Sequence, residues 1–548
     1  MTDIGQKIKD ILYGYIKAES ISNTDQEIQA KEYFLDYFSK LDYFRKHPDY
    51  YGAFDIEDDI HNRSAVWAMV KGQVNDTVVL IHHNDVVTVE DFKLLKKYAF
   101  SPDELEPELI KIKDQLADEA RVDLESGGYL FGRGGCDMKG GGSIQMALLT
   151  KYSQMEDFKG NVIVLGVPDE ENLSAGMRAG VVLLSQLKEK YGLKYKLMIN
   201  SEPHQRKNPE KGVFSFGSIG KIMPYAYIRG SLSHAGKVFE GLNPTNIMSE
   251  IVRQTEVNME MSDIVGKEAA PPPTWLYLRE NKISYDVSMP LTINGCLSVL
   301  TLNQSPMTVM NKFKDICFKS FETVIDDMNR NYKRFTEATG QPDIKLPWKP
   351  KVVEFGELYE EAEAEHGDEF VTAYNQKMKD IVIDMHEGRD TLITSNFKLV
   401  DFVYDYIDDL SPRVVVGLMP PYYPNVSDVL HEGYDDFADA LFKKLNEFTK
   451  ENYNQEYVRE DFYTGISDLS YSAMFNGKEV EKSLKRAMPF YGSIYKLPID
   501  ALEHISMPCI NIGPWGKDFH KLTERVLKKD LYERTPAILD YAIKEILR

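Results

Sequence analysis

Apolar residues in the first 220 positions follow two spacings in turn, one typical of strands and one of helices. The β-branched runs SAVWAMV, TVVLIHH and NVIVLGV predict buried strands. The segment from Ala175 to Tyr191 carries apolar residues every three or four positions, which predicts a helix. This alternation indicates βαβ units and therefore an α/β fold with a mixed, mainly parallel sheet that has helices on both faces. The short polar turn between the first two runs indicates a hairpin or two adjacent strands.

The pattern changes near Gly220, where strands and helices begin to segregate. The strand-like run IMPYAYIRGSLSH precedes a helical segment, and TVMNKFKDICFKSFETVIDDMNRNYKRF predicts a long amphipathic helix. An acidic run, EFGELYEEAEAEHGDEF, indicates a solvated helix face, and an α/β pattern returns from Val414. We therefore expect a catalytic domain in two parts, residues 1–220 and 356–548, with an inserted α+β lid domain at 221–355 and a helical acidic insertion in the second part.

Charge and composition exclude several classes of protein. The 548 residues carry a formal net charge of -21, which argues against nucleic acid or an anionic membrane as a partner. The chain has no apolar run long enough for a bilayer and begins without the pattern of a secretory signal, so we expect a cytoplasmic location. The 4 cysteines form no CxxC pair, which argues against a disulfide framework or a thiolate zinc site.

A glycine-rich segment, GRGGCDMKGGG, places Asp137 in a tight turn before a predicted helix. Glycine permits positive φ and a close approach of the backbone, which suits a carboxylate that must reach an ion from a turn. By itself the segment favours an ordinary glycine-rich loop with a solvated Asp, because such loops are common. Its interpretation therefore depends on other residues.

Histidines and carboxylates also stand where predicted strands end. In an open α/β sheet, ligands bind outside the carboxyl ends of the strands. Histidine nitrogens and carboxylate oxygens without thiolate suit zinc, with cobalt or manganese as alternatives, and two such ions need a carboxylate that bridges them. Each residue alone has a simpler structural explanation, but their succession at strand ends favours a site for two divalent metal ions. The residues are His83 and Asp85, Glu170 and Glu171, Glu202, and His520.

Two local patterns indicate a division of roles. Asp85, two residues after His83, is placed to fix the tautomer of that imidazole. The neighbouring Glu170 and Glu171 allow one carboxylate to bind metal while the other takes a proton from water.

Taken together, these motifs resemble those of the M20 metallopeptidases, and the long insertions resemble the RocB-type arginine-utilization subgroup. The segment from Gly230 to His234 is similar to the lid, or dimerisation, domain of that family, which leaves a homodimer open. The motifs that carry the resemblance are His83–Val87, Gly132–Gly134 with Asp137–Gly141, Asp169–Glu171 with Ser174 and Gly176, Glu202–Pro203, and Gly513–Pro514 with His520 and Glu524.

The resemblance implies a zinc-peptidase-like catalytic domain and a role for each residue. Asp137 bridges the two ions, His83 and Glu202 complete one site, and Glu171 and His520 complete the other. Glu170 would be the general base, and Asp85 would orient His83. His234, from the lid of the same or a partner chain, would help polarise the substrate carbonyl or hold the oxyanion, and Asp468 would lie in a loop that lines the substrate site.

The expected function is that of a co-catalytic dimetal hydrolase. Its substrate would be an amide bond in a small N-acyl amino acid or short peptide, and the subgroup resemblance connects it with arginine or amino-acid catabolism. Two alternatives stay open at this point: a broad aminopeptidase or dipeptidase, and a non-catalytic binding protein that retains the fold.

Overall fold

The computed structural model describes residues 2–282, 284–342 and 344–548, which form two compact units. Unit 1 contains the chain up to Ile219 together with Pro424–Phe475 and Pro498–Arg548. Unit 2 contains Gly220–Tyr423 and Asn476–Leu497. Unit 2 is therefore inserted into unit 1 at two places in the sequence.

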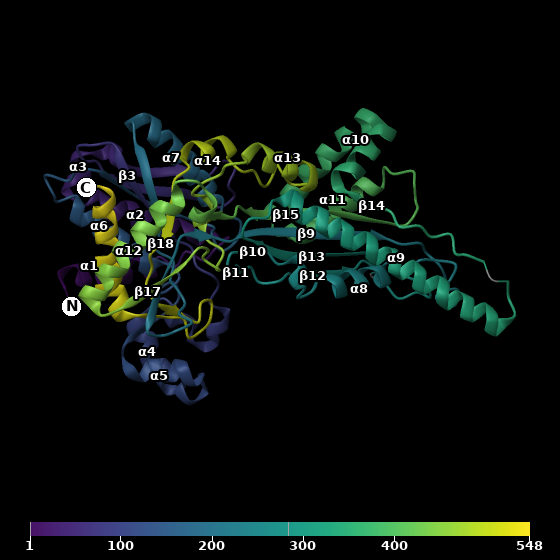
Figure 1. Ribbon diagram of the computed structural model, residues 1–548, viewed down its shortest axis with the longest axis horizontal. Coiled ribbons are helices and arrows are strands. Elements are labelled where there is room, and N and C mark those ends of the chain that lie inside the picture. The colour runs from purple at the N-terminus through teal and green to yellow at the C-terminus, as the bar shows by residue number, and fades with distance from the viewer. Residues whose placement is uncertain (1, 283, 343) are drawn as a thin grey trace. The chain divides into compact units, whose positions relative to one another are not determined.

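Unit 1 is built on a mixed sheet with the parallel strands at its centre. Figure 1 labels β3, β17 and β18 of this sheet. β3 pairs in parallel with both β5 and β6, and β18 continues in parallel beside β6. The carboxyl ends of these strands therefore meet at one edge. In spatial order the strands are β1 (Tyr51–Asp55), β2 (Ser64–Val70), β5 (Asn161–Val167), β3 (Asp76–His83), β6 (Lys194–Asn200), β18 (Cys509–Asn511), β7 (Lys211–Ser215) and β17 (Glu456–Glu460).

Helices pack on this sheet and bury it. All residues of β2 and β5 are buried, which explains their continuous apolar sequence, because a strand covered on both faces has no polar side. A small sheet of β4 (Tyr129–Phe131), β20 (Arg525–Leu527) and β19 (Gly516–Lys517) lies beside it. The helices of unit 1 are α1 (Asp3–Lys17), α2 (Ile28–Ser39), α3 (Asp42–Lys46), α4 (Pro102–Lys111), α5 (Asp118–Ser126), α6 (Lys139–Tyr152), α7 (Ala175–Tyr191), α12 (Tyr434–Tyr453), α14 (Ile499–Ile505) and α15 (Thr535–Ile546).

The predicted hairpin between β2 and β3 is wrong. β5 lies between these two strands, antiparallel to β2 and parallel to β3. A strand that is apolar on both faces gives no sign of which strand pairs with it, so closeness in sequence was misleading here. The α/β class with a mixed sheet is confirmed.

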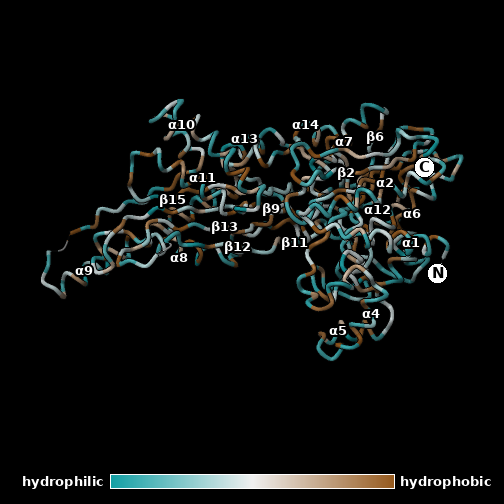
Figure 2. The backbone as a smooth tube through the Cα atoms, turned by 180° about the vertical axis from the view of Figure 1, so that it is seen from behind, coloured by the Kyte–Doolittle hydropathy of each residue, from teal (hydrophilic) through white to brown (hydrophobic). Residues whose placement is uncertain are grey.

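Unit 2 is an antiparallel sheet with helices, extended at one edge by a parallel strand. α10 and α11 pack on the sheet face that carries Tyr225 and Tyr227, and α8 and α9 pack against β9 through other residues. The tube of α9 alternates between hydrophilic and hydrophobic colours, as its amphipathic sequence predicts (Figure 2). The strands of the unit 2 sheet, in spatial order, are β12 (Thr274–Glu280), β13 (Thr292–Thr301), β9 (Gly220–Arg229), β15 (Arg413–Tyr423) and β14 (Val352–Glu354). The helices of unit 2 are α8 (Pro244–Thr255), α9 (Pro306–Thr339), α10 (Phe355–His386), α11 (Leu392–Tyr404) and α13 (Gly477–Ala487).

The end of the inserted unit differs from the predicted boundary at residue 355. β15 pairs antiparallel with β9, and α10 contributes Leu358, Ala362 and Phe370 to the core of unit 2. Leu358 and Ala362 are one helical turn apart inside the acidic run, and Phe370 follows a kink at Gly367, while most other side chains of the run are exposed or half-buried. The acidic charge therefore marked the solvated face of a helix whose other face belongs to this sheet.

None of the helices in the described ranges is both long enough and apolar enough to cross a membrane.

Replacing Leu399 with alanine tests whether α11 belongs to unit 2. Leu399 is fully buried in the cluster on the sheet face, and removing such a side chain costs about 2 to 5 kcal/mol. Hydrogen exchange measured by mass spectrometry should become faster in β9, β13 and β15 and stay unchanged in β3 and β5. Leu410→Ala, at a residue that is 63% exposed, is the control. Equal acceleration in both sheets would contradict the division into units.

Candidate active site

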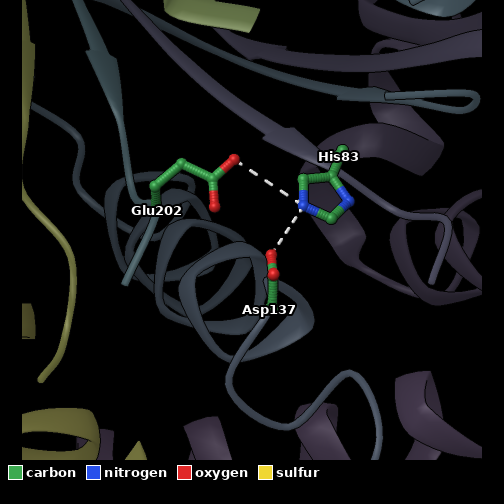
Figure 3. Close-up of side chains that lie close together, drawn as sticks. All are labelled: His83, Asp137 and Glu202. Atoms are coloured by element: carbon green, nitrogen blue, oxygen red, sulfur yellow. Dashed lines mark hydrogen bonds and ion pairs between the residues drawn. The ribbon is translucent and has the colours of Figure 1, made fainter. Parts of the chain in front are cut away.

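Three side chains from distant parts of unit 1 meet at the edge of the central sheet (Figure 3). His83 is the last residue of β3, Glu202 follows β6, and Asp137 lies in the glycine-rich loop before α6. The Nε2 atom of His83 is 3.0 Å from Oδ1 of Asp137 and 3.6 Å from Oε1 of Glu202. The parallel pairing of β3 and β6 therefore delivers two of these groups, and the loop delivers the third.

A second group forms on the other oxygen of Asp137. Nε2 of His520 lies 3.2 Å from Oδ2 of Asp137 and 3.0 Å from Oε1 of Glu171. Asp137 thus has one carboxylate oxygen beside each imidazole. His83 has a side chain that is 1% exposed, whereas that of His520 is 50% exposed, so the second group is the more open one.

The ligand atoms of these side chains are close enough to hold metal ions. His83, Asp137 and Glu202 form one set of atoms within 4.8 Å of one another, and Asp137, Glu171 and His520 form another. Imidazole nitrogen and carboxylate oxygen are donors that divalent zinc, cobalt and manganese accept. The donor set therefore fits two divalent ions that share Asp137.

The electrostatics of the cluster are those of crowded carboxylates. Burial, together with the charges of Asp137 and Glu171, raises the pKa of Glu202 well above its ordinary value. Burial opposes ionisation of Asp137, but hydrogen bonds with His520 and His83 outweigh it and lower the pKa of Asp137. Hydrogen bonds with Asp137 and Glu171 raise the pKa of His520 to about 10. The site therefore attracts positive charge, which a proton or a metal ion can supply.

Asp85 makes two kinds of contact with the cluster, one with His83 and one with the main chain of the two glutamates. Its main-chain oxygen lies 3.0 Å from Nδ1 of His83, closer than its carboxylate, which is 3.6 Å away. The carboxylate accepts hydrogen bonds from the main-chain N–H groups of Glu170, at 3.1 Å, and Glu171, at 3.3 Å. Asp85 therefore fixes both the imidazole and the turn that carries the two glutamates.

Glu524 holds the loop of Asp137, a role that the sequence did not indicate. Its Oε1 accepts hydrogen bonds from the main-chain N–H groups of Gly134, at 2.9 Å, and Asp137, at 3.3 Å, and its Oε2 accepts one from Arg133. Glu524 is buried, and burial raises its pKa to about 7. Its place in the M20-like motif was visible in the sequence, but its partners lie almost 400 residues earlier.

A buried ion network holds the turn before Glu170. Arg63 donates to Glu27 at 2.9 Å and to Asp169 at 2.5 Å, and the carboxylate of Glu27 accepts from the main-chain N–H of Asp169 at 2.9 Å. Burial of an ion pair is costly unless each charge is well paired, and here each one is. No sequence signal connects Glu27 and Arg63 with this turn.

Two glycines let the backbone segments of the site approach closely. A Cβ atom on Gly141 would lie 2.2 Å from the main-chain oxygen of Ser201, and one on Gly513 would lie 1.9 Å from that of Glu202. Both distances are too short for any side chain. The glycine-rich sequence of the loop therefore reflects tight packing of α6 and β18 around the end of β6.

The remaining predicted site residues lie in different surroundings. Glu170 is 8% exposed, and burial raises its pKa well above the ordinary value. Asp468 is 2% exposed in unit 1, and burial raises its pKa to about 7. Its charge contributes to the raised pKa of both Glu170 and Glu202. His234 belongs to unit 2 and is exposed, so its action on a substrate carbonyl stays a prediction.

Comparison with known proteins places this arrangement in a family. The profile of the peptidase family M20/M25/M40 matches residues 113–535. Over almost its whole length the chain is similar to two Bacillus subtilis proteins, YqjN (30% identity over 98% of this chain and 96% of YqjN) and RocB (24% identity over 99% and 95%). Among solved structures, the aminopeptidase PepT from Bacillus cereus has a TM-score of 0.51 at 12% identity, covering 99% of each chain.

Because the profile spans most of the sequence, the protein belongs to the M20 peptidase family and is a hydrolytic enzyme of the metallopeptidase type. The similarity to PepT shows the shared fold.

Replacing Glu524 with glutamine should weaken metal binding without removing a ligand. The amide keeps one acceptor oxygen, but its NH₂ group faces either the main-chain donors of the loop or Arg133, so Asp137 loses its fixed position. Loss of such an outer partner costs about 10- to 100-fold in metal affinity. Competition with a chromophoric chelator measures the affinity for Zn²⁺. Glu533→Gln, at an exposed residue nearby in sequence, is the control. Unchanged affinity in the Glu524 variant would show that the loop is held by other contacts.

Proposed function

We infer that the protein is a hydrolase with two divalent ions that cleaves an amide bond in a small N-acyl amino acid or short peptide. The observation that carries this proposal is the position of Asp137, with one carboxylate oxygen beside His83 and the other beside His520. A carboxylate in this position is what a pair of neighbouring ions requires.

The residues divide into two ligand sets around Asp137. His83 and Glu202 would complete the first, and Glu171 and His520 would complete the second, with zinc as the expected metal and cobalt or manganese as alternatives. When bound, such ions polarise a carbonyl group and acidify water. The cluster fits them because burial, together with the charge of Asp137, raises the pKa of Glu202 and of Glu171, and a bound cation would offset this cost of ionisation.

Glu170 is the group that we assign to proton transfer. It is adjacent to the ligand Glu171, and the main-chain N–H groups of both residues donate to the same carboxylate, that of Asp85. Burial raises the pKa of Glu170, which suits a group that takes a proton from the attacking water and returns it to the leaving amine. The carbon–nitrogen bond breaks as the amine receives this proton.

The substrate class is supported by three observations of different kinds. The family is one of peptidases, the open side of the cluster at His520 gives access to solvent, and the chain is similar to RocB. The link with arginine or amino-acid catabolism rests on the resemblance of the insertions to the RocB-type arginine-utilization subgroup. Asp468, a buried carboxylate close enough to affect Glu170 and Glu202, also favours a second candidate, an aminopeptidase that holds a free amino group. Rates on matched dipeptides with free and N-acetylated amino termini distinguish the two.

Alanine in place of Asp137 should remove both ions, whereas alanine in place of Glu202 should weaken mainly one. The reason is that the carboxylate of Asp137 lies 3.0 Å from His83 and 3.2 Å from His520, whereas that of Glu202 lies 3.6 Å from His83. Metal content per chain after dialysis, measured by inductively coupled plasma mass spectrometry, checks this, with Asp114→Ala at an exposed position as control. Two ions retained in the Asp137 variant would show that the glycine-rich segment is an ordinary loop without a role in metal binding.

Glutamine in place of Glu170 should lower kcat by about 10²- to 10⁴-fold, the usual contribution of a general acid–base group. Metal content should stay at the wild-type value, because neither of the two sets around Asp137 includes this residue, although Glu170 also has a ligand atom close to those of His83 and Glu171. Steady-state hydrolysis of the best substrate from a panel of dipeptides and N-acyl amino acids measures the effect, with Glu189→Gln on the exposed side of α7 as control. Near-normal turnover in the Glu170 variant would show that another group moves the proton.

A further inference from the structure

Unit 2 contains an open cavity of about 580 Å³ between α11 and one end of its sheet. Volumes of roughly 300 to 1,000 Å³ are typical of sites for small molecules. The cavity is lined by residues of β9, β12, β13, α11 and the segment before β13. No residue of the two ligand sets around Asp137 takes part in it.

The register of the sheet places four polar side chains side by side on the lining. Thr292 pairs with Arg229, and Asn294 pairs with Arg279, so all four lie on one face of the sheet. Tyr227 lies on the same face, two residues before Arg229, and its hydroxyl donates to Asp401 of α11. The polar row therefore faces α11.

α11 closes the cavity with one helical face. Thr394, Phe397, Lys398 and Asp401 line it and are spaced by three or four residues, which places them on one side of the helix. The ring of Phe397 stacks on that of Tyr277 from β12. The wall opposite the sheet is therefore fixed by packing.

The cationic side chains of the lining are of two kinds. Lys282 pairs with Asp286 at 2.6 Å, and Lys398 pairs with Asp390 at 2.7 Å. Within the three described ranges, by contrast, no carboxylate pairs with Arg229 or Arg279, and Nε of Arg229 is buried without a hydrogen-bond partner. A guanidinium group offers parallel N–H donors that match a carboxylate.

Acceptors stand in the same cavity. Asn294 is 3% exposed, and its Nδ2 donates to Asn281, while its Oδ1 is buried and, among the described residues, lacks a donor. One carboxylate oxygen of Asp401 accepts the hydroxyl of Tyr227, and none of the described residues donates to the other. These groups suit an N–H donor, above all a cationic one.

We propose that this cavity binds an α-amino acid in its zwitterionic form. The α-carboxylate binds Arg229 and Arg279, the ammonium group binds Asp401 and Asn294, and the side chain of the ligand packs on Phe397 and the neighbouring apolar lining. A free amino acid and a short peptide share this pair of charges. The proposal stands apart from the hydrolytic function, because it uses residues of unit 2 alone.

Binding is measured by isothermal titration calorimetry on the metal-loaded full chain, with the common L-amino acids tested one at a time and then alanyl-alanine. The best ligand is compared with its carboxamide, which lacks the carboxylate, and with its N-acetyl derivative, which lacks the ammonium group. The variants are Arg229→Gln, Asp401→Asn and Glu202→Ala, with Arg253→Gln as a control because it is exposed on α8 and pairs with Glu250.

The expected result is that at least one free amino acid binds and that both derivatives bind at least 10-fold more weakly. Arg229→Gln and Asp401→Asn should each weaken binding at least 10-fold, while Glu202→Ala and Arg253→Gln leave it unchanged. If alanyl-alanine binds more tightly than the free amino acids, and this binding is lost in the Arg229 variant, the ligand of the cavity is a short peptide. Binding that survives both lining variants and is lost in Glu202→Ala belongs to the metal cluster and overturns the proposal. The absence of binding by any amino acid at about 10 mM, roughly tenfold above a weak Kd of about 1 mM, also overturns it.

Discussion

The repulsion between carboxylates at the edge of the central sheet is the constraint on which the active site depends. Asp137, Glu171 and Glu202 stand around two imidazoles, with Glu170 beside them, and most of these groups are buried. Like charges at such spacing raise the free energy of the ionised state unless cations compensate them. Burial, together with the charges of neighbouring carboxylates, raises the pKa of Glu202, and hydrogen bonds with Asp137 and Glu171 raise the pKa of His520. Two divalent ions on either side of Asp137 would offset the repulsion.

Holding these charges together requires strong support from the fold. Because β3 pairs in parallel with β5 and β6, three groups lie at the same edge of the sheet: His83, Glu202 and the turn that carries Glu170. Glu524 fixes the loop of Asp137 through main-chain hydrogen bonds, and Arg63 fixes the turn through Asp169. Gly141 and Gly513 allow the segments to approach at distances that a side chain would forbid. The site is therefore positioned by its backbone contacts as well as by its ligands.

Much of the candidate site could be predicted because its residues follow recognisable strands. His83, Glu171 and Glu202 each stand at the end of an apolar run, and such ends converge in a parallel sheet. The partners of Glu524 and Arg63 could not be predicted, since they are separated by long stretches of sequence and no local pattern records the contact. The prediction that β2 and β3 are adjacent was wrong for a related reason. The sequence of a strand that is buried on both faces does not indicate which strands pair with it. The extent of unit 2 was not predicted because the many acidic residues of α10 drew attention away from the apolar face of this helix.

The most direct test of this account is the anomalous diffraction of a crystal of the zinc-loaded protein, recorded on both sides of the zinc absorption edge. Two zinc peaks are expected on opposite sides of Asp137, one in contact with His83 and Glu202 and the other in contact with Glu171 and His520. A single peak, or two peaks of which one lies away from Asp137, would contradict the bridging role on which the proposed function is built.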